Sequence, residues 1–229
     1  MSRGCFVTGT DTGVGKTLVT AGLISLFSEE GIKVAGMKPV ASGCEKTEKG
    51  LRNEDAVMIM QQANVDLDYE LINPYAFAPP VSPHFAARER DQNIELDHIV
   101  EKFKAISDQV DLVVVEGVGG WQVPLSNNLN VSDLAEKLNL PVILVVGLRL
   151  GCINHALLTA DAIRQKGLSL IACVVSQIDA DYQRLNETQE TLETKIGIPV
   201  QLIPKIENAT PELTTQYLEE TKNQINENI

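Results

Sequence analysis

The sequence contains little cysteine and no long apolar run. Its 229 residues include four cysteines that form no CxxC pair and have no Cys/His spacing typical of a zinc site. No stretch reaches eighteen consecutive apolar residues, and the N-terminal segment MSRGCFVTG lacks the apolar region and cleavage site of a signal peptide. We therefore expect a soluble, cytoplasmic protein with reduced thiols at Cys5, Cys44, Cys152 and Cys173.

Positive charge is also scarce. The chain has 19 Lys and Arg residues against 31 Asp and Glu residues, which gives a formal net charge of −12 at pH 7. The resulting repulsive field opposes binding to nucleic acid or to an anionic membrane, so we expect neither as a main partner. Any anionic ligand must be held by groups close to it.

Short β-branched runs alternate with amphipathic stretches along the chain. The apolar residues within these runs are continuous, which is typical of strands buried on both faces of a mostly parallel sheet. We therefore predict a single α/β domain over residues 1–229, with helices on both faces of the sheet. The expected strands are 5–8, 33–40, 112–116, 142–147, 170–176 and 200–204, and the expected helices are 17–29, 55–63, 94–107, 132–138, 153–166, 184–196 and 210–226.

Two segments depart from this alternation. The stretch from about 66 to 93 is rich in proline and aromatic residues, and we expect an ordered loop because Tyr69, Tyr75, Phe77 and Phe85 need packing partners. The tail QYLEETKNQINENI is charged, and we expect a solvated helix end there.

The segment GTDTGVGKT, residues 9–17, predicts a phosphate-binding loop of the P-loop NTPase type. It follows a strand and opens a helix, and its glycines allow backbone N–H groups to approach an anion. Lys16 can reach the β and γ phosphates, and the Thr17 hydroxyl can ligate Mg²⁺. The spacing differs from the Walker A pattern, because Thr10 stands where the first glycine is expected.

Three charged residues are candidates for the remaining chemistry. Glu116 ends an apolar strand, where ligands of open α/β sheets gather, and is a candidate Mg²⁺ ligand. Lys38 ends the second expected strand and should reach the same edge of the sheet. The residues alone favour a helix N-cap for Asp55, and a metal ligand is the alternative.

Five segments together resemble the dethiobiotin synthetase family. They are GTDTGVGKT, MKPVASGCEKTEKGLRNEDA, INPYAFAPPVSPHFAA, VEGVGGWQVPLS and LPVILVVGLRLGCINHALLT, and the resemblance covers about residues 5–167. It implies an ATP- and Mg²⁺-dependent ligase of biotin synthesis that converts 7,8-diaminopelargonic acid and CO₂ to dethiobiotin, ADP and phosphate. The implied route runs through a carbamate and a mixed carbamic-phosphoric anhydride.

The resemblance also implies roles for individual residues. The residues implied in catalysis are Lys38, Lys16, Thr12 and Ser42, and those implied in Mg²⁺ coordination are Thr17, Asp55 and Glu116. Nucleotide binding falls to Gly13, Val14, Gly15, Lys16, Thr17, Leu18, Asp55, Glu116, Gly117, Val118, Gly119, Ser176, Gln177, Pro204, Lys205 and Ile206. Substrate binding falls to Thr12, Lys38, Ser42, Gly119, Gly151, Cys152, Ile153 and Asn154.

The segment GCINH, residues 151–155, opens an expected helix whose free N–H groups suit a carboxylate. The residues alone favour an ordinary cap at Asn154, with Cys152 and His155 packed in the core. The resemblance implies instead that this segment binds the distal carboxylate of the substrate in the neighbouring subunit of a homodimer. It leaves His155 with a structural role.

The chain departs from the family pattern at two places. Ser176 and Gln177 stand where the family usually has an Asn that holds adenine, and Gly13 stands where some members have a glutamate. Preference for ATP over other triphosphates therefore does not follow from these residues.

Three other classes of protein share the loop. Positioning ATPases of the MinD and ParA kind carry a lysine early in the loop, where this chain has Asp11, and often end in a basic helix, where this chain has the acidic NQINENI. Amidating synthetases of corrin biosynthesis need a glutaminase domain, for which 229 residues leave no room. A non-catalytic nucleotide-binding module leaves Lys38, Asp55 and Glu116 together unexplained.

Overall fold

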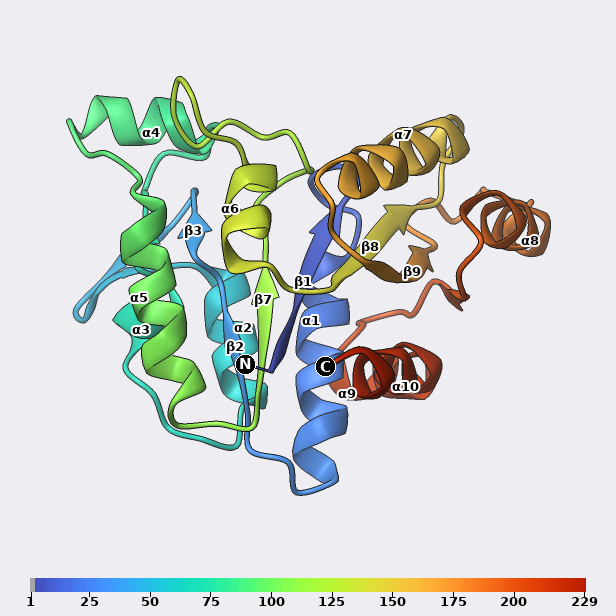
Figure 1. Cartoon of the computed structure of the whole chain (residues 1–229), viewed down its shortest axis with the longest axis horizontal. Helices are drawn as coiled ribbons and strands as arrows, with labels where there is room; N and C mark the ends of the chain where they lie inside the picture. The colour runs from blue at the N-terminus through green and yellow to red at the C-terminus, as the bar shows by residue number, and fades with distance from the viewer. Residues whose placement is uncertain (1–2) are drawn as a thin grey trace.

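The computed structural model describes residues 3–229, in which one parallel sheet lies between two layers of helices (Figure 1). The six strands follow the order β10-β9-β8-β1-β7-β2, and every neighbouring pair is parallel. Each of the six expected strands is confirmed. Their bounds are β1 (Gly4–Gly9), β2 (Val34–Met37), β7 (Leu112–Glu116), β8 (Val142–Gly147), β9 (Leu170–Ser176) and β10 (Val200–Ile203).

Side chains of the strands alternate between two hydrophobic clusters, one on each face of the sheet. In β1, Cys5 and Val7 enter one cluster and Phe6 enters the other. The continuous apolar runs in the sequence are therefore explained by burial on both faces. One face is covered by α1 (Lys16–Glu29), α2 (Glu54–Gln62) and α10 (Glu219–Asn228), and the other by α5 (Leu96–Ser107), α6 (Val131–Leu138) and α7 (Cys152–Gln165), with α8 (Leu185–Ile196) beside β10.

The second strand is shorter than expected. It ends at Met37, and residues after it form β3 (Val40–Ala41), which pairs with β6 (Tyr75–Ala76) in a separate two-stranded sheet. The change of partner has a local cause. The Lys38 N–H donates to the Ile72 carbonyl at 2.8 Å, and Pro39 has no N–H to continue the ladder.

The expected loop at 66–93 contains two short helices, α3 (Tyr69–Ile72) and α4 (Pro83–Glu89), in addition to β6. Three of its aromatic residues pack as expected, since Tyr69, Tyr75 and Phe77 are buried. Phe85 is not buried with them: it is 44% exposed on α4 and packs against its neighbours there, with the His84 ring centroid at 3.9 Å and the Arg88 guanidinium 5.3 Å from its ring. A hairpin of β4 (Glu45–Thr47) and β5 (Gly50–Arg52) was also not expected.

The C-terminal tail is less solvated than expected. It forms α9 (Pro211–Thr214), a 3₁₀ turn η1 (Thr215–Tyr217) and α10, and not one continuous helix. Leu218 and Ile225 are fully buried in the cluster that also contains residues of α1. The tail therefore covers one face of the sheet.

Strand order decides which residues meet at the carboxyl edge of the sheet. Because β7 lies between β1 and β2, the ends of these three strands are neighbours. Met37 is in register with Val115, and Val7 is in register with Glu116, so Lys38 follows directly beside Glu116. Within residues 3–229, no helix combines the length and apolar character needed to cross a bilayer.

Candidate active site

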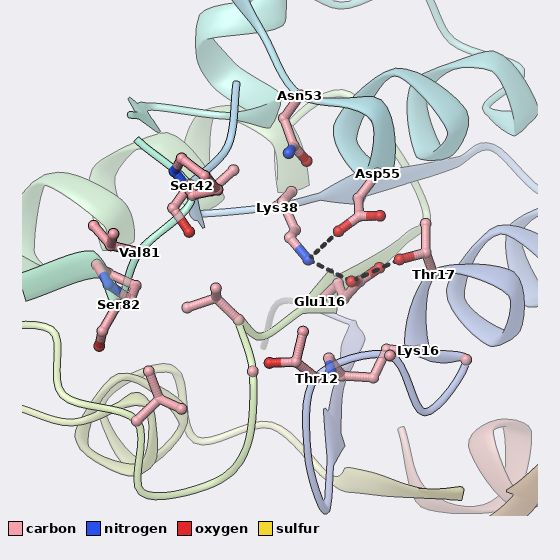
Figure 2. Close-up of a pocket in the computed structure, with 18 of the residues that line it drawn as sticks. Thr12, Lys16, Thr17, Lys38, Ser42, Asn53, Asp55, Val81, Ser82 and Glu116 are labelled. Carbon is pink, nitrogen blue, oxygen red and sulfur yellow. Dashed lines mark hydrogen bonds and ion pairs between the residues drawn. The ribbon is translucent and has the colours of Figure 1, made fainter. Parts of the chain in front are cut away.

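A cavity of about 760 Å³ lies at this edge of the sheet. The glycine-rich loop and the start of α1 form one wall, the ends of β2 and β7 form the floor, and the segment before α4 forms the opposite wall (Figure 2). Its volume is in the range of small-molecule sites. The lining residues are Thr12, Gly13, Gly15, Lys16, Thr17, Leu18, Lys38, Ala41, Ser42, Asn53, Asp55, Pro80, Val81, Ser82, Pro83, Glu116, Val118, Gly119 and Val123.

The backbone of the loop requires its glycines. Gly13 has φ +72° and Gly15 has φ +96°, a left-handed conformation that glycine adopts without strain. Gly15 is also the N-cap of α1, and as a glycine it has no side chain that could cap the helix start. The first N–H groups of α1 therefore remain available to an anion, which is how helix starts bind phosphate.

Lys16 lies at the base of this loop with its side chain buried. Its Nζ donates to the Asp11 carbonyl at 2.8 Å. Burial, and secondly the positive charge of Lys38, lower the pKa of Lys16 to about 8. An anion bound in the loop would favour the charged form of this lysine.

Asp11 connects the loop to the segment between β8 and α7. Its carboxylate accepts the Thr12 N–H at 2.8 Å and pairs with the Arg149 guanidinium at 2.5 Å. The hydrogen bond from Arg149 and the one from the Thr12 N–H hold the pKa of Asp11 below its usual range. Sequence reasoning missed Arg149, because nothing local relates it to a residue 138 positions earlier.

Lys38 occupies the centre of the site (Figure 2). Its Nζ lies 2.9 Å from Asp55 Oδ2 and 2.5 Å from Glu116 Oε1, and it also donates to the Gly117 carbonyl at 3.4 Å. Lys38 is 3% exposed and Glu116 is fully buried. Burial alone would lower the pKa of Lys38, but Glu116 and Asp55 outweigh it and hold this pKa above its usual value.

Asp55 is not the N-cap of its helix, contrary to the interpretation that its residue type favoured. Asn53 caps α2 by accepting the Ala56 N–H at 3.2 Å, and Asp55 follows in the first turn. Burial tends to raise the pKa of Asp55, but the charge and hydrogen bond of Lys38, together with Thr17 and Lys16, outweigh burial and hold this pKa below its usual value. The charged carboxylate therefore lines the cavity while it is paired with Lys38.

The oxygen atoms at this point fit a magnesium ion. The Thr17 hydroxyl donates to Glu116 Oε1 at 3.1 Å, and Glu116 Oε2 is buried without a hydrogen-bond partner. In the part of the chain that is described, no three His, Cys, Asp or Glu side chains form a metal cluster by themselves. Mg²⁺ normally needs only one or two carboxylates, with phosphate oxygens and water completing its shell. Thr17, Asp55 and Glu116 provide such a partial set.

The structure brings most predicted site residues to the cavity. Of the others, Val14 and Gly117 are buried and do not line the cavity, and the Gly117 carbonyl accepts a hydrogen bond from Lys38. The predicted base-binding residues lie outside the lining but near the loop. A Cβ on Gly15 would lie 3.1 Å from Ser176 Oγ, and Gln177 Oε1 accepts the Lys205 N–H at 3.0 Å. Pro204 and Ile206 flank Lys205 in the turn after β10.

Residues 151–154 do not reach the cavity within one chain. Gly151 is the N-cap of α7, Cys152 is buried, Ile153 is partly buried and Asn154 is exposed. His155 is exposed as well, so its packing in the core is wrong. A second hollow, of about 410 Å³, lies between the middle of α7 and the loop residues Thr10, Asp11, Gly120, Trp121, Gln122, Val123 and Pro124.

Sequence reasoning assigned no role to several lining residues. The largest group is Pro80, Val81, Ser82 and Pro83, which forms the wall opposite the loop. The motif SPH at 82–84 contributed to the family resemblance, and that was the available signal. Ala41, Asn53 and Val123 lie next to assigned residues and carry no chemical signal of their own.

Comparison with solved structures agrees with the fold. The chain superposes on a ParA family ATPase from Chlorobium tepidum with a TM-score of 0.57 and 15% identity, covering 100% of this chain and 97% of the other. For the septum site-determining protein MinD from Pyrococcus horikoshii the TM-score is 0.56 with 14% identity, covering 99% and 96%. At these identities the likeness shows the fold alone.

Comparison of sequences is more specific. The chain matches the family model described as AAA domain over residues 3–212. It is 47% identical to the ATP-dependent dethiobiotin synthetase BioD of Pseudomonas aeruginosa (strain LESB58), over 93% of this chain and 95% of the relative. It is 45% identical to BioD 1 of Escherichia coli O157:H7 over 87% and 89%. The chain therefore belongs to the ATP-dependent dethiobiotin synthetase family.

Proposed function

We propose that this protein is an ATP-dependent ligase that closes the ureido ring of dethiobiotin in biotin biosynthesis. Its substrates are 7,8-diaminopelargonic acid, CO₂ and ATP, and its products are dethiobiotin, ADP and phosphate. The observation that carries the proposal is the buried ammonium of Lys38, held by Asp55 and Glu116 on the floor of a cavity whose wall is the phosphate loop. The names of the relatives agree with this reaction.

The nucleotide lies with its phosphates along residues 13–18 and α1. The N–H groups at the helix start and Lys16 contact the β and γ phosphates, and Ser176, Gln177 and residues 204–206 lie on the side that receives the base. Thr17, Asp55 and Glu116 would hold Mg²⁺, which would neutralise negative charge on the phosphates. Glu116 Oε2, buried without a partner, supports this assignment.

The chemistry requires three steps. A neutral amine of the substrate adds to CO₂ and loses a proton, which forms a carbamate. A carbamate oxygen then takes the γ-phosphoryl group, the bond to the β-phosphate oxygen breaks, and ADP leaves. The second amine attacks the carbonyl carbon, the bond to the phosphate oxygen breaks, and the amine loses its proton as the ring closes. Phosphorylation thus turns a poor leaving group into a good one.

The chain contributes orientation and charge to these steps. Thr12 and Ser42 face the cavity from opposite walls and can hold the carbamate oxygens, while Lys38 and Lys16 neutralise the charge that develops on the transferred group. Lys38 needs little reorganisation during the reaction, because two carboxylates already fix its ammonium. No covalent bond to the enzyme is needed.

A homodimer completes the site in this proposal. At the start of α7 the Cys152 N–H donates to the Arg149 carbonyl at 3.0 Å, while the N–H groups of Ile153 and Asn154 have no backbone acceptor within residues 3–229. This helix start does not reach the cavity of its own chain, so a second copy would supply it to the distal carboxylate of the substrate. Leu150 and Leu158, beside and within α7, are 96% and 62% exposed, which supports burial there by a partner. The pattern of cysteines favours a reducing compartment, so we place the enzyme in the cytoplasm.

One assay tests the function directly. The purified protein is incubated with diaminopelargonic acid, bicarbonate, Mg²⁺ and ATP, and both ADP and the ureido product are followed, with a control that lacks the diamine. We expect ADP release that depends on the diamine and matches product formation. ADP release that is indifferent to the diamine would contradict the proposal and would instead agree with a nucleotide-switched ATPase.

A further inference from the structure

Lys38 and Asp55 are also connected through a second, buried route, which runs through Tyr69 and Asn73, two residues that do not line the cavity. The amide of Asn73 donates to the Lys38 carbonyl at 2.6 Å, and its Oδ1 accepts the Tyr69 hydroxyl at 3.0 Å. The Tyr69 hydroxyl oxygen in turn accepts the Asn53 N–H at 2.8 Å. Asn53 caps the helix that carries Asp55 two residues later.

These contacts form a closed ring. From the backbone of Lys38 the chain of hydrogen bonds passes through Asn73 and Tyr69 to the backbone of Asn53 and so to Asp55, and the Lys38–Asp55 ion pair at 2.9 Å closes it. The ion pair between Lys38 and Asp55 is therefore one contact within a closed, hydrogen-bonded frame. We refer to this frame as the Tyr69–Asn73 ring.

Within the Tyr69–Asn73 ring, the tyrosine hydroxyl accepts one hydrogen bond and donates another. This hydroxyl accepts from Asn53 N–H, which directs the hydroxyl hydrogen to Asn73 Oδ1 and leaves the amide NH₂ to face the Lys38 carbonyl. Burial raises the pKa of Tyr69, which keeps the hydroxyl a donor. Tyr69, Asn73 and Asn53 are all buried, so water does not easily replace a lost bond.

The Tyr69 ring itself has an independent anchor. The Arg52 guanidinium lies 4.0 Å from the ring centroid, a cation–π contact that phenylalanine at this position would retain. Removal of the hydroxyl alone would therefore leave the side chain in place and break only the polar frame.

On the basis of the proposed function, we propose that Tyr69 and Asn73 are positioning residues of this enzyme. They touch neither substrate nor nucleotide, and they hold Lys38 and Asp55 at the separation needed for phosphoryl transfer and for Mg²⁺ binding. Small displacements of groups in such sites have large effects on rate, and partners of metal ligands commonly affect metal affinity.

The test compares Tyr69→Phe with a matched control, Tyr75→Phe. Both tyrosines are buried in the same segment, and each hydroxyl accepts one backbone N–H, from Asn53 at 2.8 Å and from Glu95 at 3.0 Å. Of the two hydroxyls, that of Tyr69 also donates a hydrogen bond to Asn73. A purely structural role predicts the same consequences for both variants.

We expect kcat of Tyr69→Phe to fall by about 10–100-fold, while KM for the diamine changes little. The affinity for Mg²⁺ in the presence of a non-hydrolysable ATP analogue, measured by calorimetry, should fall by about 10-fold. Tyr75→Phe should lose thermal stability to a similar extent and keep wild-type kcat and Mg²⁺ affinity. Equal kcat and Mg²⁺ affinity in the two variants would overturn the proposal.

A second variant checks that Tyr69 and Asn73 act as one unit. Asn73→Ala combined with Tyr69→Phe should lower kcat no further than the more damaging single change, because both break the same ring. If Asn73→Ala does not fold, the comparison of Tyr69→Phe with Tyr75→Phe, which each remove one oxygen atom, still tests the proposal. A wild-type enzyme without diamine-dependent turnover would contradict the proposed function, and calorimetry would still test the ring.

Discussion

Replacement of Lys38 by methionine removes the charge at the centre of the site and keeps most of the side-chain volume. In the wild type, the ammonium is 2.5 Å from Glu116 Oε1, and Glu116 is fully buried. Among residues 3–229, the variant leaves this carboxylate with only the Thr17 hydroxyl as a hydrogen-bond partner. Removal of one member of a buried ion pair typically costs about 3–5 kcal/mol. Asp55 contributes less, because its side chain is 43% exposed to solvent.

The same substitution should nearly abolish turnover. Loss of one preorganised donor at a developing charge lowers rates by about 10²–10³. The variant should stay folded, because domains of this kind are stable by about 5–15 kcal/mol. Activity and stability therefore have to be measured on the same preparation, by diamine-dependent ADP release and by urea unfolding.

Two further variants distinguish the effect of losing the buried ion pair on stability from the effect of losing any lysine side chain. Lys137→Met removes an ion pair with Asp97 whose side chains are 49% and 82% exposed, and we expect a change within about 0.5 kcal/mol. Lys38→Met combined with Glu116→Gln should recover much of the lost stability, because the amide needs no counter-charge. The reasoning is refuted if Lys38→Met is as stable as Lys137→Met, or if the double variant is less stable than Lys38→Met.

Three more predictions concern the site and the core. The pKa of Lys16 is about 8, and a bound phosphate favours its ammonium form, so nucleotide binding near pH 8 should be accompanied by proton uptake. This uptake is measured by calorimetry in two buffers of different ionisation enthalpy. It should be absent in Lys16→Met. This pKa in the folded protein lies below the usual 10.5, so between pH 8 and 10.5 the unfolded chain binds more protons than the folded protein. Lys16 should therefore make the free energy of unfolding rise with pH in this range. A free energy of unfolding that falls with pH in the wild type relative to Lys16→Met would contradict this. A Cβ on Gly36 would lie 1.9 Å from Ile59 Cγ2, so Gly36→Ala should lower the free energy of unfolding by about 1–3 kcal/mol, and less in an Ile59→Ala background.

Most of the secondary structure could be predicted from the sequence because its signals are local. The six strands of the sheet have continuous apolar runs, and the loop at 9–17 has its own glycine spacing. The segment around 66–93 was harder, since α3 and α4 are short and contain few periodic positions. Its tyrosines pack as expected, but Phe85 stays exposed, because α4 lies at the mouth of the cavity and not over the sheet.

The sequence by itself also determined which residue types are available for the proposed chemistry, through the loop, Lys38 and the motifs of the family. It did not determine their partners. Lys38 meets Glu116 across 78 positions, and Asp11 meets Arg149 across 138. These contacts exist because β7 lies between β1 and β2 and because β8 lies on the other side of β1. Strand order is a property of the whole packed sheet, so only the tertiary structure could decide which charges are paired and buried.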